Sequence, residues 1–381
     1  MIDKVSLIVP SHNNLRYIKN TYKSIREYYD SVEIVLMDDG SDDGTWEWLE
    51  SVGKQDENVI LFKSEKRVGH TILYDKGIEL TDKKIVGILH ADMIIGPNYL
   101  ENLLKHLKPG KVVCATRVEP PLHPAGKEKI VMDFGLEHNT IDWGGFNNFC
   151  KLKQQQDKGK TTKGMFAPWL LYKSDFDDVG GHDPLFAPFP YEDSDIFQRW
   201  ILNGYKMVQS RDSFVYHLTC RGHRWTKEIG KNDDYFTKVE EKARINYIRK
   251  WGSWIENTPY QHPIIPPRYD RGIEIINTDS NSLYQLEPWF DNIKSDYGHD
   301  FYIKNNQVNT SIDLSKKFVD NLTNDVIVKV DMDTFKKEDM HFIHQLNKIV
   351  QDSGEVGEFK LGNLHIVINR VENKVNELIK L

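Results

Sequence analysis

The chain has 381 residues, a length that suggests two domains or one large domain with an appendage. Its composition, 39% hydrophobic and 28% charged residues, is typical of a globular protein. Its formal net charge of −7 and its pI near 6.1 argue against a general nucleic-acid-binding protein. The three cysteines lie far apart, so we expect no disulfide framework, no structural zinc site and a cytoplasmic setting. We also expect neither a secretory leader nor a membrane-spanning segment.

The first ninety residues alternate between strand-like and helix-like patterns. Short apolar runs predict strands at 5–9, 32–37, 59–63 and 85–89. Helical spacing of apolar residues predicts helices at 15–29, 43–52 and 72–80. This alternation predicts an α/β fold with a mostly parallel sheet flanked by helices, whose ligands gather at the carboxyl ends of the strands.

The pattern loosens beyond residue 110. We expect the polar Lys/Gln run at 151–163 to form an exposed or mobile loop. Farther along, the pattern predicts a helix at 193–203, a strand at 214–217 and a helix at 233–251.

Four prolines in the stretch 259–267 mark a candidate domain boundary. We therefore expect a large domain at 1–258, a Pro-rich linker at 259–271 and a small α/β accessory domain at 272–381. Within the accessory domain, the pattern predicts strands at 326–330 and 364–368 and a helix at 337–351.

The strand at 85–89 ends in His90-Ala91-Asp92. A carboxylate just past a buried strand lies where open α/β sheets bind their ligands, so Asp92 is well placed to hold a metal ion. The simpler alternative is that Asp92 caps the following turn.

A second acidic segment, Asp38 to Thr45, follows the second strand. Its Asp, Ser and Gly residues suit a turn and a helix N-cap. Asp39 could also accept a hydrogen bond from a nucleobase N–H, with Pro10 to Asn14 as a second wall of the same crevice.

Several segments of the chain, taken in chain order, resemble those of the family 2 glycosyltransferases, which are inverting enzymes with a GT-A fold. The resemblance covers roughly residues 1–255. The matching pieces are Val9-Pro10-Ser11-His12-Asn13, Asp38 to Thr45, His90-Ala91-Asp92, Gly180-Gly181-His182-Asp183, Tyr191-Glu192-Asp193 and His217.

The resemblance implies a metal-dependent transfer of a sugar from a nucleotide-diphosphate donor to an acceptor hydroxyl, on a glycan. It implies that Asp193 is the general base and that Glu192 binds the acceptor. It also implies that Asp92 and His217 hold Mn²⁺ or Mg²⁺. The implied donor-binding residues are Pro10, His12, Asp39, Arg67, His90, Ala91 and Asp92.

The chain departs from the family pattern at two places. His90 replaces the first acid of an Asp-x-Asp motif, and Tyr74-Asp75 replaces an Arg-Asn pair. The first departure bears on the ribose contact and the metal preference, and the second on phosphate or sugar contacts.

Several further residues have two readings. The basic segments Lys66 to His70 and Arg221 to Arg224, which includes His223, could bind phosphate or form solvated loops. Trp143, Trp169 and Trp225 could stack on sugar rings or pack in the core, and we assign Trp169 to acceptor binding.

Asp331-Met332-Asp333 is a literal Asp-x-Asp after a strand. It lacks an upstream nucleotide-binding half, so we interpret it as a solvated strand end. Two alternatives to a glycosyltransferase remain: a nucleotidyltransferase that makes a nucleotide sugar, and a catalytically inactive carbohydrate-binding protein.

Overall fold

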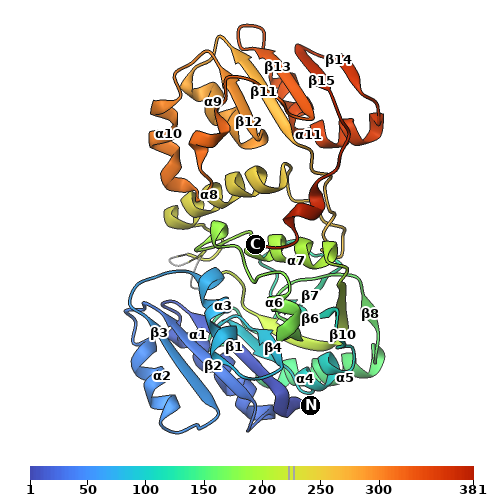
Figure 1. Cartoon of the computed structure of the whole chain (residues 1–381). Helices are drawn as coiled ribbons and strands as arrows, with labels where there is room; N and C mark the ends of the chain where they lie inside the picture. Colours follow the sequence, from blue (N-terminus) through green and yellow to red (C-terminus); the bar gives the residue numbers. More distant parts are fainter. Residues whose placement is uncertain (222–223, 226–227) are drawn as a thin grey trace. The chain divides into compact units, whose positions relative to one another are not determined.

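The computed structural model describes residues 1–221, 224–225 and 228–381, which divide into two units (Figure 1). Unit 1 comprises Met1–Val239, Asn257–Pro263 and Lys380–Leu381, and unit 2 comprises Glu240–Glu256 and Ile264–Ile379. The Pro-rich segment is thus divided between the units. The assignment of a transferase domain, a linker and an accessory domain stays a prediction.

The sheet of unit 1 begins with parallel strands joined by helices. Each strand pairs in parallel with its neighbour in the order β3-β2-β1-β4. Their bounds are β1 (Val5–Ser11), β2 (Glu33–Asp39), β3 (Val59–Ser64) and β4 (Ile85–Ile88). The helices along this half are α1 (Leu15–Tyr28), α2 (Thr45–Gly53) and α3 (His70–Leu80). The strands and helices predicted for residues 5–89 are therefore confirmed.

The sheet continues in the order β9-β6-β10-β5, with β7 beside β6 and β8 beside β10. Because β9 is antiparallel to both β4 and β6, and β10 is parallel to β6, strands β6 and β10 run in the direction of β4. The carboxyl ends of β1 to β4, β6 and β10 therefore share one edge. The bounds are β5 (Met93–Ile95), β6 (Lys111–Glu119), β7 (Lys129–Val131), β8 (Thr161–Thr162), β9 (Trp169–Tyr172) and β10 (Lys206–His217).

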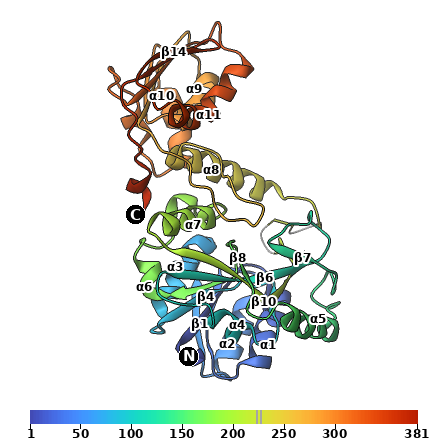
Figure 2. The same ribbon diagram turned by 90° about the vertical axis from the view of Figure 1, so that its right-hand side faces the viewer.

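Helices cover both faces of this sheet (Figure 2). The remaining helices of unit 1 are α4 (Tyr99–Leu104), α5 (Trp143–Gln156), α6 (Lys173–Asp177) and α7 (Glu192–Leu202). Helix α3 approaches the sheet closely at Gly77, where a Cβ would lie 2.3 Å from Ile8 Cγ2 and 2.8 Å from Met37 Sδ. The predicted α/β fold with a mostly parallel sheet flanked by helices is confirmed.

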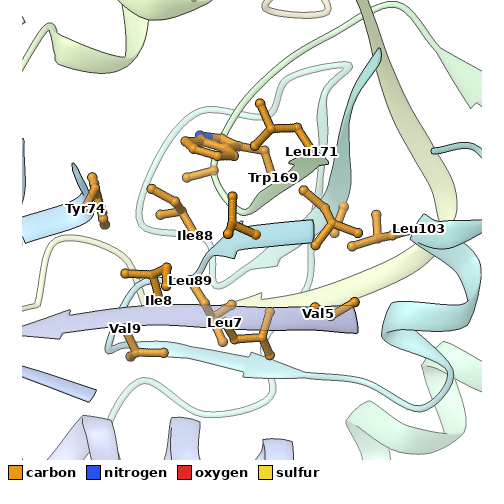
Figure 3. Packing of buried hydrophobic residues seen from close by; sticks show 14 of the residues in the cluster. Val5, Leu7, Ile8, Val9, Tyr74, Ile88, Leu89, Leu103, Trp169 and Leu171 are labelled. Atoms are coloured by element: carbon orange, nitrogen blue, oxygen red, sulfur yellow. The ribbon is translucent and has the colours of Figure 1, made fainter. Parts of the chain in front are cut away.

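The core of unit 1 surrounds β1 and β4. The side chains of Leu7, Ile8 and Val9 on β1 pack with Ile88 of β4 and with Leu171 of β9 (Figure 3). All five are at most 1% exposed. These apolar runs are the ones from which the strands were predicted, because a strand buried on both faces needs no polar alternation.

Two predictions in the middle of the chain are corrected in their extent. The run at 151–163 is not an exposed loop throughout, because α5 extends to Gln156. Lys and Gln are good helix formers, and Phe146 and Cys150 bury one face of α5. The strand predicted at 214–217 is the end of the longer β10.

Unit 2 is a smaller α/β unit with the strand order β12-β11-β13-β15-β14. The first three of these strands pair in parallel and the last two form an antiparallel edge. The strands are β11 (Arg271–Ile276), β12 (Asn292–Ser295), β13 (Val326–Asp331), β14 (Gly357–Leu361) and β15 (Leu364–Ile368). The helices are α9 (Ser280–Leu286), α10 (Asp300–Asn306), α11 (Lys337–Ser353) and the part of α8 (Asp234–Trp251) that begins at Glu240.

A buried ionic cluster lies within unit 2. The Glu287 side chain is fully buried and accepts hydrogen bonds from Arg249, Lys317 and Tyr302. Burial alone would raise the Glu287 pKa, but Lys317 and Arg249 lower it to about 2. These charges are paired within the fold, so the cluster is structural.

Over the described residues, no helix has both the length and the apolar character needed to cross a lipid bilayer.

Candidate active site

The candidate residues of unit 1 gather at the carboxyl edge of its sheet. Asp39 ends β2, His90 and Asp92 follow β4, and His217 ends β10. Met93 of β5 pairs with His217 in the sheet, which brings the segment after β4 beside the end of β10. The shared edge therefore joins segments more than a hundred residues apart.

His90, Asp92 and His217 form a cluster that could hold a divalent metal ion. One ligand atom from each of the three lies within 4.8 Å of the other two. The Asp92 carboxylate lies 3.5 Å from His217 Nε2, and the His90 and His217 rings meet edge to face at 5.6 Å. Asp92 and His217 are 4% and 6% exposed. One carboxylate and two imidazoles leave room in the coordination shell for substrate oxygens.

Sequence reasoning missed Glu119, which ends β6 and lies behind this cluster. Its carboxylate accepts a hydrogen bond from His217 Nδ1 at 3.0 Å, and it also pairs with Arg117 and Lys129. Burial alone would raise the Glu119 pKa, but His217, Arg117 and Lys129 hold it well below its usual range. Imidazoles that bind metals commonly donate their other N–H to a carboxylate in this way.

The electrostatics of His217 also fit a cation. Burial would lower its pKa, but the Asp92 and Glu119 carboxylates together raise it to about 9. Two anions therefore favour positive charge at this imidazole. A metal ion at Nε2 would replace the proton, while Nδ1–H would keep its bond to Glu119.

We expect Glu119→Gln to weaken Mn²⁺ binding roughly 10- to 100-fold, because the ring loses its charged partner. Titration of the purified protein with Mn²⁺, followed by electron paramagnetic resonance, measures the affinity. Glu128→Gln is the matched control, because Glu128 lies 3.6 Å from Arg117 in the same ionic cluster and has no hydrogen bond to His217. Equal losses in both variants would contradict the assignment of Glu119.

A strained turn follows His217. Thr219 and Cys220 both have left-handed backbones, with φ of 58° and 61°, which is uncommon outside glycine and rare for a β-branched residue such as Thr219. The turn brings the Arg221 amide back to the Asp92 carboxylate at 3.3 Å. Such strain persists where surrounding structure enforces it, often at functional sites.

Arg221 itself is a buried cation with unused donors. Its side chain is 6% exposed, and Nη2 donates to the Leu136 carbonyl at 2.7 Å. Over the described residues, its Nε and Nη1 have no hydrogen-bond partner. His223, which the sequence grouped with Arg221, lies outside the described residues.

The ends of β1 and β2 are linked by a hydrogen bond. His12 Nδ1 donates to the Asp39 carbonyl at 2.7 Å. The Asp39 carboxylate accepts hydrogen bonds from the Val68 and Gly69 amides at 2.7 and 2.9 Å. Asp39 therefore orders the loop between β3 and α3.

The other predicted donor-site residues lie near this loop or in the strands beside it. The Arg67 guanidinium lies over the Phe189 and Tyr235 rings at 5.1 and 4.8 Å. Pro10 is within β1, and the Ala91 carbonyl accepts a hydrogen bond from Thr21 at 2.7 Å.

Glu192 and Asp193 are the first two residues of α7. Tyr191 before them has a φ of 83°, so the backbone turns sharply into the helix. Asp193 accepts hydrogen bonds from the Ser194 amide at 2.6 Å and hydroxyl at 3.4 Å. Burial and then the neighbouring Glu192 carboxylate raise the Asp193 pKa to about 6, a value suited to a general base.

Tyr74 is close to both the acid pair and the His90, Asp92 and His217 cluster. Its ring stacks on His90 with centroids 6.5 Å apart. Burial, and then the Glu192, Asp193 and Asp92 carboxylates, raise the Tyr74 pKa well above its usual range. The departure from the family pattern at residue 74 thus places a buried ring among the three carboxylates.

The assignment of Trp169 to acceptor binding is not supported. Trp169 is 2% exposed on β9 and packs edge to face on Trp200 at 5.2 Å, within the core shown in Figure 3. A sugar ring cannot reach the indole there. Trp225 is also buried and stacks on His123 at 4.9 Å, while Trp143 lies beneath Lys23.

The Asp-x-Asp segment of unit 2, Asp331 to Asp333, forms hydrogen bonds with neighbouring residues of unit 2. Asp331 ends β13, and its carboxylate accepts hydrogen bonds from the Asn277 side chain and the Asp333 amide. The structure therefore gives this segment a turn-forming role, in line with its interpretation as a strand end.

Part of the chain is similar to known proteins. Residues 6–180 match the family model "Glycosyl transferase family 2". Glycosyltransferase GlyG of Streptococcus pneumoniae serotype 4 is 28% identical over 28% of this chain and 36% of its own length. Putative glycosyltransferase EpsH of Bacillus subtilis is 30% identical over 26% of this chain and 29% of its own. The chain thus spans about a third of the length of these relatives.

Among solved structures, a mannosyltransferase from Pyrobaculum calidifontis in complex with GDP-Man and Mn²⁺ is 18% identical. It covers 65% of this chain and 63% of its own, with a TM-score of 0.44. GalNAc-T7 with UDP, GalNAc and Mn²⁺ is 16% identical and covers 65% of this chain and 50% of its own, with a TM-score of 0.45.

The family match defines the class of the N-terminal part of the chain, a glycosyltransferase domain. Over residues 6–180, the chain is similar to glycosyl transferase family 2.

Proposed function

We propose that the chain is a metal-dependent inverting glycosyltransferase that moves a sugar from a nucleotide-diphosphate donor to an acceptor hydroxyl, on a glycan. One observation carries this proposal. The His90, Asp92 and His217 cluster and the buried pair Glu192 and Asp193 both lie close to the buried side chain of Tyr74. The match of residues 6–180 to the family model supports the proposal.

The donor site is proposed at the carboxyl edge of the parallel strands. Pro10, His12, Asp39 and Arg67 form its nucleotide side, and His90, Ala91 and Asp92 its diphosphate side. His90, Asp92 and His217 would hold the cation, and the imidazoles favour Mn²⁺ over Mg²⁺. When bound, the cation would neutralise the negative charge that develops on the leaving diphosphate.

The chain's own residues supply the remaining steps. The unpartnered Nε and Nη1 donors of Arg221 suit a phosphate oxygen beside the cluster. Asp193 takes the proton from the attacking acceptor hydroxyl, and Glu192 accepts a hydrogen bond from the acceptor. With one base and a single displacement, the configuration at the anomeric carbon inverts.

A donor screen tests the proposal. The protein is heated with each of a panel of UDP-, GDP- and dTDP-sugars, with Mn²⁺ or with EDTA. We expect at least one sugar nucleotide to raise the unfolding temperature only when Mn²⁺ is present, because a ligand that binds the folded state stabilises it.

The donor found in this screen is then incubated with a panel of glycans. Transfer with inversion, detected by mass spectrometry and NMR, supports the proposal. Pyrophosphate release from a nucleoside triphosphate and a sugar phosphate would instead show a nucleotidyltransferase. Binding without transfer to any glycan would favour a carbohydrate-binding protein.

The rate of transfer should depend on pH through Asp193. Its pKa is raised to about 6, so the carboxyl becomes protonated as the pH falls through that value and can no longer accept a proton. We expect the turnover at saturating donor to fall about tenfold for each pH unit below 6. Glu192→Gln should move this limb to lower pH, because it removes the neighbouring negative charge; a limb that does not move would contradict the coupling.

A further inference from the structure

His70, the first residue of α3, lies directly against the acid pair. Its Nε2 is 2.8 Å from Glu192 Oε1. Its ring stacks on Phe189 with centroids 5.3 Å apart and an interplanar angle of 17°, and it lies 5.2 Å from the Tyr74 ring. An ionised carboxylate can only accept, so Nε2–H donates to Glu192.

The backbone around His70 is fixed by the segment that leads into α7. Gly69 has a φ of 92°, and a Cβ there would lie 2.2 Å from Pro188 Cβ, so only glycine fits. The Thr71 hydroxyl donates to the Pro188 carbonyl at 3.0 Å. The two segments that carry His70 and Glu192 are therefore held together independently of the bond between these side chains.

Glu192 keeps one oxygen unused. The residue is 6% exposed, and its Oε1 is taken by His70. Its Oε2 is buried and has no hydrogen-bond partner in the part of the chain that the structure describes. A buried carboxylate oxygen without a partner costs free energy, which a ligand N–H or O–H would recover.

We infer that His70 is the positioning residue of the acid pair: its hydrogen bond to Oε1 orients Glu192, with Oε2 open to a hydrogen-bond donor of the acceptor, and so leaves Asp193 to take the proton. This inference rests on the proposed transferase function of the same site. The family resemblance assigns roles to Glu192 and Asp193 and none beside them to His70.

The electrostatics support this division of roles. Burial alone would raise the Glu192 pKa, but His70, and less strongly His182, lower it. Burial and the ionised Glu192 raise the Asp193 pKa, and the hydrogen bond from the Ser194 amide and, less strongly, His70 moderate this rise. Without the His70 donor, the two carboxyls would compete for one proton, as in other close carboxylate pairs.

Two substitutions separate the hydrogen bond from the packing of the ring. His70→Phe keeps an aromatic ring on Phe189 and removes the donor. His70→Gln loses the ring and keeps an amide N–H close to the position of Nε2. Protein labelled with ¹³C at the aspartate carboxyls is titrated by NMR, and the resonance that disappears in Asp193→Asn identifies Asp193.

We expect the titration midpoint of Asp193 to rise by about one pH unit in His70→Phe and by clearly less in His70→Gln, which keeps the hydrogen-bond donor but not the charge of the imidazole. An unchanged midpoint in His70→Phe, or an equal rise in both variants, would overturn the inference. A purely structural role of the ring predicts the opposite order, with the larger change in His70→Gln.

Glu192→Gln gives an independent check that leaves His70 and the shape of the site in place. Its Asp193 midpoint should fall below that of the wild type, and a midpoint at or above the wild-type value would overturn the inference. The titration needs neither donor nor acceptor. A wild-type protein that transfers no sugar would therefore end the proposed function, whereas the response to His70→Phe judges His70 separately.

Discussion

Asp193→Asn should bind the donor as tightly as the wild-type protein and yet transfer sugar about 10³-fold more slowly. The amide keeps the size of the side chain and can still accept a hydrogen bond from the Ser194 amide, so the start of α7 should stay in place. It cannot take a proton from the acceptor hydroxyl at neutral pH. The loss should therefore appear in turnover, with little change in donor affinity.

The measurement combines calorimetry for donor binding with nucleoside diphosphate release for turnover, both with Mn²⁺ present. Asp177→Asn is the matched control, because Asp177 is an exposed acid at the end of α6 that lies outside the proposed site. Turnover within tenfold of the wild-type rate in Asp193→Asn would show that another group accepts the proton. A parallel loss of donor binding would show that Asp193 acts on the donor.

The parts of the site that follow predicted strands could be placed from the sequence. A buried apolar run identifies the strand before His90 and Asp92, and parallel strands bring their carboxyl ends to one edge. Glu119 could not be found in this way, because polar residues interrupt the apolar run of β6. The structure buries those residues with partners: Thr116 donates to the Ser210 carbonyl at 2.7 Å, and Arg117 pairs with Glu119.

The contacts of side chains from distant segments were also beyond the sequence. His70 and Glu192 are 122 positions apart, and nothing local to either residue indicates their hydrogen bond. Trp169 shows the converse difficulty, because an indole suits both a sugar ring and a core, and only the packing of β9 decides between them. Residue type therefore predicts which chemistry is available, and tertiary packing determines which groups can use it.

Asp92→Ala should abolish Mn²⁺-dependent donor binding, with a loss of at least about 10²-fold in the affinity for Mn²⁺. Asp92 is the only carboxylate in the His90, Asp92 and His217 cluster of described residues, so its removal leaves two imidazoles and no anionic ligand. It also removes the acceptor of the Arg221 amide, which helps to hold the strained turn after His217. Both effects act on the diphosphate end of the proposed donor site.

Electron paramagnetic resonance of Mn²⁺, with and without the sugar nucleotide found in the donor screen, distinguishes this site from the rival Asp-x-Asp. Asp333→Ala is the control, since it removes an exposed carboxylate of the literal motif in unit 2 and should leave Mn²⁺ binding unchanged. If Asp333→Ala released the ion and Asp92→Ala did not, the metal would belong to unit 2. The grouping of His90, Asp92 and His217 would then reflect hydrogen bonding alone. If Asp92 binds the metal directly and Glu119 only supports His217, the loss of Mn²⁺ affinity should be largest in Asp92→Ala and smaller in Glu119→Gln.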